Sequence, residues 1–245
     1  MTIENKIVAI TGAGRGIGRA TAIHLAARGA HLVLGARSEA EIATVAEEIA
    51  AAGGQAVYRA IDVTKPDDLE VLVKLSCERF GRLDVIINNA GIGPLSRFDA
   101  LKVEDWDAMI DVNLKGALYG IAAALPVFKQ QDTGHVINVV STAGIKIVPT
   151  MGVYAATKNA LRTATEALRQ ESGKSLRVTE ISPGFIDTTF ADAAIVDPDI
   201  RAVMLKRKEE LAISPTAIAR AIAFAIEQPS DVEIGSIVVR PTAQD

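Results

Sequence analysis

The chain has 245 residues, of which 49% are hydrophobic and 23% are charged, and its formal net charge is −4. This length and composition are typical of one globular domain with a sizeable core, and they exclude a disordered chain. An acidic balance gives no basic surface for nucleic acid, and no apolar run reaches the roughly 18 residues that a membrane span needs, so we expect neither partner.

Few residues suit a metal site or a disulfide. Cys77 is the only cysteine, so no internal disulfide can form. The histidines, His24, His31 and His135, are scattered without ligand spacing, and we expect no metal. The first residues lack the basic and apolar regions of a signal peptide. Together these features favour a reducing, cytoplasmic location.

A glycine-rich loop lies between the first predicted strand, residues 6–11, and a helical pattern over residues 19–28. Strand, glycine loop and helix is the arrangement of dinucleotide-binding folds, in which the helix start offers free N–H groups to a pyrophosphate. Ile17 occupies the place of the last glycine in the common G-x-G-x-x-G spacing, so a plain tight turn is the alternative; the flanking elements favour a nucleotide. The candidate cofactor-binding residues here are Gly12, Gly14, Arg15, Gly16, Ile17 and Gly18.

The second predicted strand, residues 31–35, ends where NAD-binding proteins carry an acid for the adenosine ribose. Arg37 stands there instead, and it can pair with the 2'-phosphate of NADP, with Arg15 as a second positive charge. Two solvated arginines are the alternative. Glu39 is not the missing acid, because Ser38 and the acids after it are typical of a capping box that opens the next helix. We therefore predict NADP(H) as the cofactor.

Strands and helices alternate regularly along the rest of the chain, with short links. Such alternation predicts an α/β fold, a Rossmann-type doubly wound parallel sheet of about seven strands flanked by helices, in a single domain over residues 1–245. Ligands of such sheets bind beyond the carboxyl ends of the strands, where Asp62 and the run Asn88-Asn89-Ala90-Gly91 fall. For that run a simple strand terminator is the alternative. The further predicted strands are residues 55–61, 83–87, 135–140, 176–181 and 236–240, and the further helices are residues 38–52, 66–80, 104–129, 154–173 and 214–227.

Two stretches depart from the regular pattern. Residues from about 185 to 212 alternate apolar and charged side chains around Pro198, which indicates a mobile helical lid over a substrate. In the long helix, Asn113 is followed three residues later by Gly116, which invites a local kink or a bound water. From the residues alone, Asn113 is a satisfied structural amide.

The chemistry is expected around Tyr154. Lys158 follows it by four residues in a run of good helix formers, so both side chains share one helix face. A neighbouring ammonium stabilises a phenolate and lowers its pKa, which makes the pair a tunable acid/base. Ser141 ends a buried strand thirteen residues earlier, where strand end and helix start can meet.

Together these residues resemble the short-chain dehydrogenase/reductase family over essentially the whole chain. Each motif is weak alone, but their agreement in order and spacing is highly specific. The motifs are Thr11-Gly12-x-x-x-Gly16-x-Gly18, Asp62, Asn88-Asn89-Ala90-Gly91, Asn113, Ser141, Tyr154-x-x-x-Lys158 and Pro183-Gly184.

The resemblance implies a role for each position. Tyr154 would be the general acid in carbonyl reduction and the base in alcohol oxidation, and Ser141 would hold the substrate oxygen. Lys158 would lower the tyrosine pKa and bind the nicotinamide ribose. Asn113 would anchor a water that links this lysine to bulk proton supply, which replaces the structural role. The implied cofactor-binding residues after the glycine loop are Arg37, Asp62, Val63, Asn89, Ala90, Gly91, Tyr154, Lys158, Pro183, Gly184, Ile186 and Thr188.

The predicted function is that of an NADP(H)-dependent oxidoreductase that interconverts a ketone or aldehyde with an alcohol. A lyase or epimerase with the same Tyr-Lys pair is disfavoured by the short chain, and a nonenzymatic NADP-binding regulatory protein by the filled catalytic positions. The end of the chain lacks the Asp-Gly-Gly turn of many tetrameric members, so the expected homo-oligomer is a tetramer or a dimer. An uncharged substrate body is expected because the candidate pocket residues are apolar: Ile92, Pro94, Ala143, Ile145, Val148, Phe185 and Phe190.

Overall fold

The fold is built on one parallel sheet of seven strands in the order β3-β2-β1-β4-β5-β6-β7. It was analysed as a computed structural model, which describes residues 2–190 and 198–244. The strands are β1 (Ile7–Thr11), β2 (His31–Ala36), β3 (Gln55–Ala60), β4 (Val85–Asn88), β5 (Gly134–Val139), β6 (Leu176–Pro183) and β7 (Ser236–Val239). This confirms the predicted single-domain, doubly wound α/β fold.

The order of the strands reverses between β1 and β4. Starting from β1, the chain adds β2 and β3 on one side, and then returns to add β4 and the later strands on the other. At such a point the two crossovers run in opposite directions and leave a crevice beyond the carboxyl ends of the strands. Thr11 ends β1 and Asn88 ends β4, so both predicted motifs reach this crevice.

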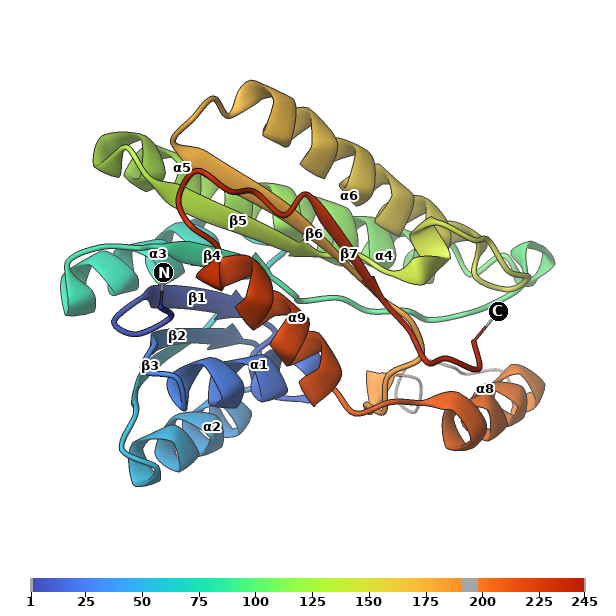
Figure 1. The fold of residues 1–245 in the computed structure, drawn as a ribbon. Helices are drawn as coiled ribbons and strands as arrows, with labels where there is room; N and C mark the ends of the chain where they lie inside the picture. Colours follow the sequence, from blue (N-terminus) through green and yellow to red (C-terminus); the bar gives the residue numbers. More distant parts are fainter. Residues whose placement is uncertain (1, 191–197, 245) are drawn as a thin grey trace.

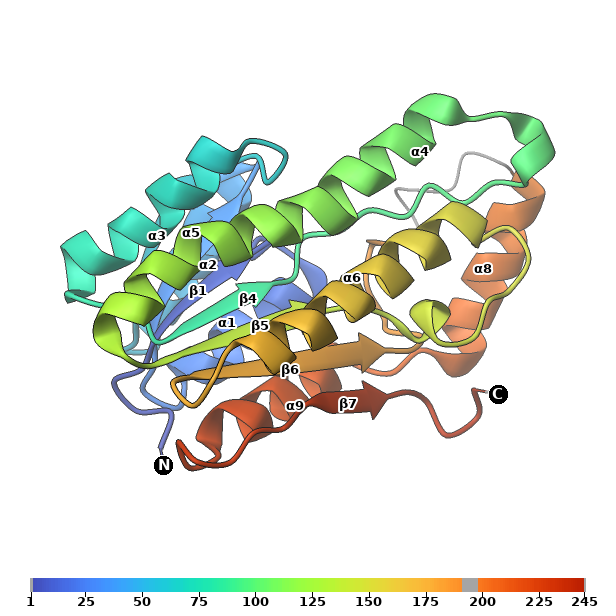
Figure 2. The ribbon, with the colours of Figure 1, turned by 90° about the horizontal axis from the view of Figure 1, so that it is seen from above.

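Helices cover both faces of the sheet (Figure 1). On one face, α1 (Gly16–Ala26) and α2 (Glu39–Ala51) pack against the β1 and β2 side of the sheet, and α9 (Thr216–Glu227) packs against α1, β6 and β7. On the other, α3 (Pro66–Phe80), α5 (Gly116–Gln131) and α6 (Gly152–Glu171) lie side by side in Figure 2. The remaining helices are α4 (Val103–Ile110), α8 (Pro198–Leu211) and the short turns η1 (Phe98–Ala100) and η3 (Thr142–Gly144).

The long helix predicted over residues 104–129 is present as α4 and α5, joined without a break by the π-helical segment η2 (Asp111–Lys115). The predicted kink is therefore a π-bulge, and Asn113 lies at its centre. By length and composition this helix, Val103–Gln131, could cross a membrane, which a search for uninterrupted apolar runs does not reveal. A core helix passes the same test, and α5 contributes Ile121 and Phe128 to the core beneath it.

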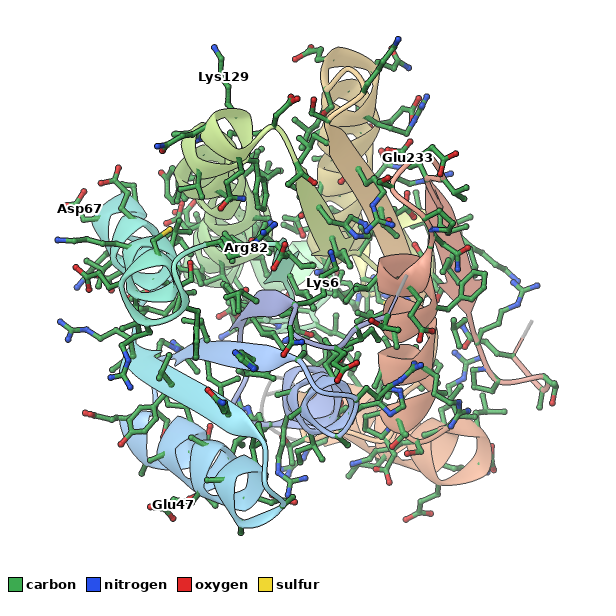
Figure 3. All side chains as sticks on the ribbon, turned by 60° about the vertical axis from the view of Figure 1, so that its left-hand side comes forward. Lys6, Glu47, Asp67, Arg82, Lys129 and Glu233 are labelled. Carbon is green, nitrogen blue, oxygen red and sulfur yellow. The ribbon has the colours of Figure 1, made fainter. Side chains whose placement is uncertain are left out.

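Charged groups anchor the amino ends of the central strands. Asp84 is buried, and its carboxylate accepts a hydrogen bond from the Ile7 backbone N–H at 2.9 Å and pairs with Arg82 at 2.6 Å. Lys6 adds a longer contact to the same carboxylate at 3.9 Å. Figure 3 shows Lys6 and Arg82 at this end of the sheet, opposite to the crevice. The amino end of the sheet is therefore closed by its own ion pairs.

A buried chain of polar side chains ties two strands to α6. Asn88 of β4 donates to Asn138 of β5 at 2.8 Å, and Asn138 donates to the hydroxyl of Thr165 at 2.9 Å. Because buried polar groups are costly unless they are paired, this chain fixes one arrangement of β4, β5 and α6. It lies directly behind the predicted catalytic residues of α6.

Part of the predicted lid lies outside the described residues. Residues 191–197 are not described, and α8 begins at Pro198, the residue expected to interrupt the pattern. The described part is attached to the domain by a parallel bridge between Ile186 and Ile213. Lid movement stays a prediction.

Candidate functional site

A cavity of about 670 Å³ opens beyond the carboxyl ends of the strands. It brings together nearly all of the predicted site residues, although they come from segments far apart in sequence. Two do not line it: Gly18 and Asn113 lie behind its wall. The predicted residues that line it are Gly12, Gly14, Arg15, Gly16, Ile17, Arg37, Asp62, Val63, Asn89, Ala90, Gly91, Ser141, Tyr154, Lys158, Pro183, Gly184, Ile186 and Thr188.

The glycine loop is held in place by Asn89. Its side-chain amide donates to the carbonyl oxygens of Thr11 and Gly12 at 2.9 and 3.2 Å, and the Thr11 hydroxyl accepts the backbone N–H of Asn89 at 3.1 Å. A Cβ on Gly18 would lie 2.2 Å from the Gly12 carbonyl oxygen. Gly18 is therefore required for loop–helix packing, and its part in cofactor binding stays a prediction.

The loop ends in a helix start suited to an anion. Helix α1 begins at Gly16, three residues before the predicted start, because the last part of the glycine motif is its first turn. No side chain caps this end, and its first turn carries no acid. Its free N–H groups and positive dipole end are therefore available to a phosphate. Gly12, at φ +66°, supplies the backbone turn that leads there.

The corner beyond β2 carries both signs of charge. Arg15 and Arg37 line it, as predicted. Ser38 caps α2 and accepts the Glu41 backbone N–H at 3.3 Å, as the capping-box pattern indicates. The sequence analysis missed Glu41 as a cavity residue; a Cβ on Gly14 would lie 2.9 Å from its carboxylate. An acid therefore stands beside the predicted phosphate site.

Asp62 is held as a carboxylate at the end of β3. Burial acts to raise its pKa, but hydrogen bonds from the Thr64 backbone and hydroxyl, at 3.0 and 2.8 Å, and the charges of Lys65 and Arg37 outweigh it and lower the pKa. Both bonds go to one oxygen. The other oxygen remains to accept a hydrogen bond from a ligand.

Ser141 and Tyr154 come together at the centre of the cavity. Ser141 precedes η3 and accepts the Ala143 backbone N–H at 3.1 Å, which orients its hydroxyl. The Tyr154 side chain lies close enough to Ser141 for that residue to lower the pKa of the phenol. Its ring packs against Phe190, with 5.8 Å between the ring centroids. The predicted convergence of the two hydroxyls is therefore present.

The predicted direction of the Tyr154 pKa is wrong for this arrangement. Burial raises the pKa, because the phenolate would lose its hydration, and the hydrogen bond with Ser141 offsets this only in part. Lys158 is not among the groups that act on the phenol. The four-residue spacing places the two side chains on one face, but it does not direct the ammonium at the phenol.

Lys158 is almost fully buried, with 4% of its surface exposed. Its ammonium donates to the carbonyl oxygen of Val139, the last residue of β5, at 3.0 Å. Burial lowers the lysine pKa to about 8. The side chain thus links α6 to the end of the strand that carries Ser141.

The side-chain amide of Asn113 forms its hydrogen bonds within the protein. Its amide exchanges two hydrogen bonds of 2.8 Å with the backbone of Ile92, and its nitrogen also donates to the Thr157 hydroxyl at 3.2 Å. This matches the structural amide inferred from the residues alone. Gly91 lies between the Asn113 side-chain oxygen and the Lys158 ammonium. A Cβ on Gly91 would lie 3.3 Å from the oxygen and 3.4 Å from the ammonium nitrogen. The water role implied by the family stays a prediction.

Most of the predicted substrate pocket is present. Ile92, Ala143, Ile145, Val148, Phe185 and Phe190 line the cavity. Pro94 does not; it borders a separate small hollow with Phe98 and Trp106. The prediction for Pro94 is therefore wrong. Residues missed at this end of the cavity include Lys146, Met151, Met204, Arg207, Leu211, Arg240, Ala243 and Gln244.

Gln244 connects two loops of the site. Its side-chain oxygen accepts the Phe185 backbone N–H at 2.9 Å, and its nitrogen donates to the Thr142 hydroxyl at 3.3 Å. Gly184 is needed beside it, since a Cβ there would lie 2.2 Å from the Gln244 oxygen. The end of the chain is thus a wall of the cavity. No sequence signal marks this glutamine, because its partners are distant in sequence.

We expect the pH dependence of stability to report the buried lysine. Between a folded pKa of about 8 and the ordinary value of 10.5, the unfolded chain binds a proton that the folded chain does not. The free energy of unfolding of the wild type should therefore rise with pH in this range, by on the order of 3 kcal/mol relative to Lys158→Met. Urea unfolding at a series of pH values measures this. Parallel curves would contradict the assignment, and exposed Lys129→Met, which points outward in Figure 3, is the control.

We expect Gln244→Ala to loosen the two loops that it joins. The Phe185 N–H loses its acceptor, so amide hydrogen exchange should become faster in peptides covering residues 141–146 and 184–190, measured by mass spectrometry. Thr242→Ala, at an exposed position of the same segment, should leave both peptides unchanged. Equal exchange in wild type and Gln244→Ala would show that the bridge contributes nothing to loop order.

Comparisons with known proteins agree with this geometry. A family model described as short chain dehydrogenase matches residues 6–198. An uncharacterized oxidoreductase of Listeria monocytogenes is 44% identical over 247 residues, covering 100% of this chain and 99% of its own. An alcohol dehydrogenase from the archaeon Thermococcus sibiricus, solved with 5-hydroxy-NADP, is 33% identical with a TM-score of 0.88 and 99% coverage of both chains.

A second solved structure carries the other nicotinamide cofactor. A short-chain dehydrogenase/reductase from Burkholderia phymatum, in complex with NAD, is 27% identical with a TM-score of 0.89, covering 97% of this chain and 90% of that one. The family match, the full-length relative and the converging serine and tyrosine hydroxyls lead to one conclusion: the chain belongs to the short-chain dehydrogenase/reductase family and is an oxidoreductase.

Proposed function

We propose that this oxidoreductase interconverts a carbonyl group and an alcohol with NADP(H), with Tyr154 as the proton donor and acceptor. The observation that carries the proposal is that the Ser141 and Tyr154 side chains line the same cavity, where Ser141 acts on the phenol. A carbonyl oxygen can accept hydrogen bonds from both of them. The nicotinamide, when bound, supplies or accepts the hydride.

The residues present fit such a cofactor. The uncapped start of α1 and the turn at Gly12 suit a pyrophosphate, and the carboxylate of Asp62 suits a donor group on an adenine. Lys158 also lines the cavity, and its ammonium would bind a ribose hydroxyl. Small residues from Asn89 to Gly91 leave the cavity floor open between these points.

Proton transfer in the proposed reaction involves atoms of the chain itself. In reduction, the Tyr154 hydroxyl gives its proton to the substrate oxygen while Ser141 keeps a hydrogen bond to that oxygen. The raised pKa of Tyr154 keeps the phenol protonated at neutral pH, which suits the donor role.

The preference for NADP is proposed on Arg37 and Arg15. Both line the corner beyond β2, and neither forms an ion pair within the described residues. A guanidinium can bind a phosphate through two parallel hydrogen bonds. Glu41 in the same corner acts against a phosphate, so the balance of Arg37 and Glu41 decides the preference.

Self-association and a cytoplasmic location stay predictions. Support for a homo-oligomer comes from the apolar side chains Val103, Ile110 and Leu118, which are 49%, 38% and 38% exposed along the long helix. Such exposed apolar side chains on one helix are typical of surfaces that a second chain covers.

We expect Tyr154→Phe to lower kcat for carbonyl reduction by about 10²- to 10⁴-fold, because the proton donor is lost while the ring is kept. NADPH oxidation against a panel of ketones and aldehydes measures kcat, and NADPH fluorescence measures Kd, which should change little. Tyr58→Phe, at an exposed position, is the matched control. Near-normal turnover in Tyr154→Phe would defeat the mechanism. NADPH binding without turnover by the wild type across the panel would favour a nonenzymatic role.

We expect Arg37→Asp to raise the Kd for NADPH by about 10- to 100-fold, since a charge-assisted phosphate contact is replaced by repulsion. The Kd for NADH should stay equal or fall. Fluorescence titration of each cofactor measures both values. Arg79→Asp makes the same charge change at an exposed position on α3 and should alter neither. Unchanged NADPH affinity in Arg37→Asp would refute the phosphate contact.

A further inference from the structure

The outer end of the cavity combines apolar walls with positive charge. Its walls are formed by side chains from the loop after β5, from α6, from the loop after β6 and from α8. The apolar residues among them are Ile145, Val148, Met151, Phe185, Phe190, Met204 and Leu211. The charged residues at this end are Lys146, Arg207 and Arg240. Figures 1 and 2 both show α8 beside the last residues of the chain, so these segments face one another.

We infer that the substrate is an oxo acid or hydroxy acid with an apolar chain, whose carboxylate binds at this cationic end. The inference rests on the proposed function and names the substrate class of the same site. It differs from the uncharged substrate body that we predicted from the apolar residues alone, because that prediction did not include the three cations.

Arg207 is the central residue of this proposal. Its guanidinium lies over the Phe185 ring, 5.9 Å from the ring centroid. The backbone of Phe185 is in turn fixed by the side chain of Gln244. Two other cations of the same helix face carboxylates, Lys206 at 3.9 Å from Glu210 and Lys208 at 3.4 Å from Asp187.

Arg207 forms no ion pair with any carboxylate of the described residues. A guanidinium stacked on an aromatic ring keeps its edge N–H groups available, and these match the two oxygens of a carboxylate. The arginine is therefore held against the cavity wall with its hydrogen-bond donors unused by the described part of the chain.

Lys146 and Arg240 reach the cavity from two other segments. Lys146 follows Ser141 by five residues, and its backbone N–H is bonded to the Thr142 carbonyl at 2.9 Å. Arg240 packs against the Pro183-Gly184 turn, where a Cβ on Gly184 would lie 2.7 Å from the Arg240 Cβ. Neither forms an ion pair within residues 2–190 and 198–244.

The positions of the acidic residues around the cavity also support a carboxylate at the cationic end. Among its described lining residues the acids are Glu41 and Asp62, and both lie at the adenosine end. Among the described residues, the outer end therefore carries three positive charges and no lining acid, in a chain whose formal net charge is −4. A cleft lined by one sign of charge raises the local concentration of oppositely charged ligands. The apolar walls favour an aliphatic chain over a sugar phosphate, whose hydroxyls would find few partners there.

The test compares pairs of substrates that differ only in charge. Straight-chain aliphatic oxo acids and their primary amides are reduced with saturating NADPH, and kcat/KM is measured at low and high NaCl concentration. We expect kcat/KM to be about 10- to 100-fold higher for the acids than for the amides, because only a carboxylate forms charge-assisted hydrogen bonds with the cations. The preference should shrink as salt increases. Equal values for acid and amide, or a preference for the amide, would overturn the inference while leaving the proposed function intact.

Variants then locate the carboxylate. Arg207→Gln should lower kcat/KM for the acids about tenfold or more, mainly through KM, and leave the amides and the Kd for NADPH within about twofold. Lys146→Gln and Arg240→Gln should act in the same direction. Arg201→Gln, on the same helix but away from the cavity wall, is the control. An equal loss for acid and amide in Arg207→Gln would show that the arginine is only structural and would overturn its role.

A binding measurement separates failure of this inference from failure of the proposed function. Saturated fatty acids without an oxo group should raise the Tm of the NADPH-loaded protein, whereas their amides should not. Stabilisation by the acids without turnover of any carbonyl would support the anion site and defeat the proposed reaction. If the acids do not raise the Tm but neutral ketones are turned over, the anion site is refuted and the proposed reaction is supported.

Discussion

The site depends on the hydrogen bonds that Asn89 makes across the reversal point of the sheet. At this point β1 and β4 are neighbours, and the chain after each strand must leave in a different direction. The Asn89 amide holds the carbonyl oxygens of Thr11 and Gly12, while the Thr11 hydroxyl accepts the backbone N–H groups of Asn89 and Ala90. The glycine loop and the end of β4 are thereby one rigid unit. A cofactor bound to the loop would be placed relative to the catalytic residues by this unit.

A second set of polar contacts extends that unit to α6. The chain from Asn88 through Asn138 to Thr165 crosses two strands and reaches the helix, and Lys158 bonds back to the end of β5. Asn113 closes the third side by clamping Ile92, which requires a local π-helical turn in an otherwise regular helix. These buried bonds favour one geometry of the site over its near alternatives, even though the side-chain oxygen of Asn88 has no hydrogen-bond partner among the described residues.

The sequence predicts the fold and most of the site because both follow from local signals. Alternating apolar runs locate the strands, and the order of β-strands and glycine turns places Asp62, Asn89, Ser141 and Tyr154 at one edge of one sheet. Gln244 could not be found, because a glutamine near the end of a chain has no local pattern and its partners are far apart in sequence. The sequence pattern assigned Glu41 to a helix cap. That assignment is correct, but Glu41 also lines the cavity. Spacing shows which residues share a face; it shows neither how deeply a group is buried nor what its charge touches.

The tyrosine illustrates that difference. A lysine four residues away predicts an acidified phenol, yet burial raises the Tyr154 pKa and the ammonium is bonded to a backbone carbonyl. A phenol with a raised pKa is protonated at neutral pH, so it carries the proton that reduction of a carbonyl would need. Oxidation requires the phenolate, which is stabilised if the Lys158 ammonium turns from the Val139 carbonyl towards the phenol. The same lysine, with its pKa lowered to about 8, loses its positive charge as the pH rises above that value. A rise in pH that helps to deprotonate the tyrosine therefore also removes the lysine charge that would stabilise the phenolate.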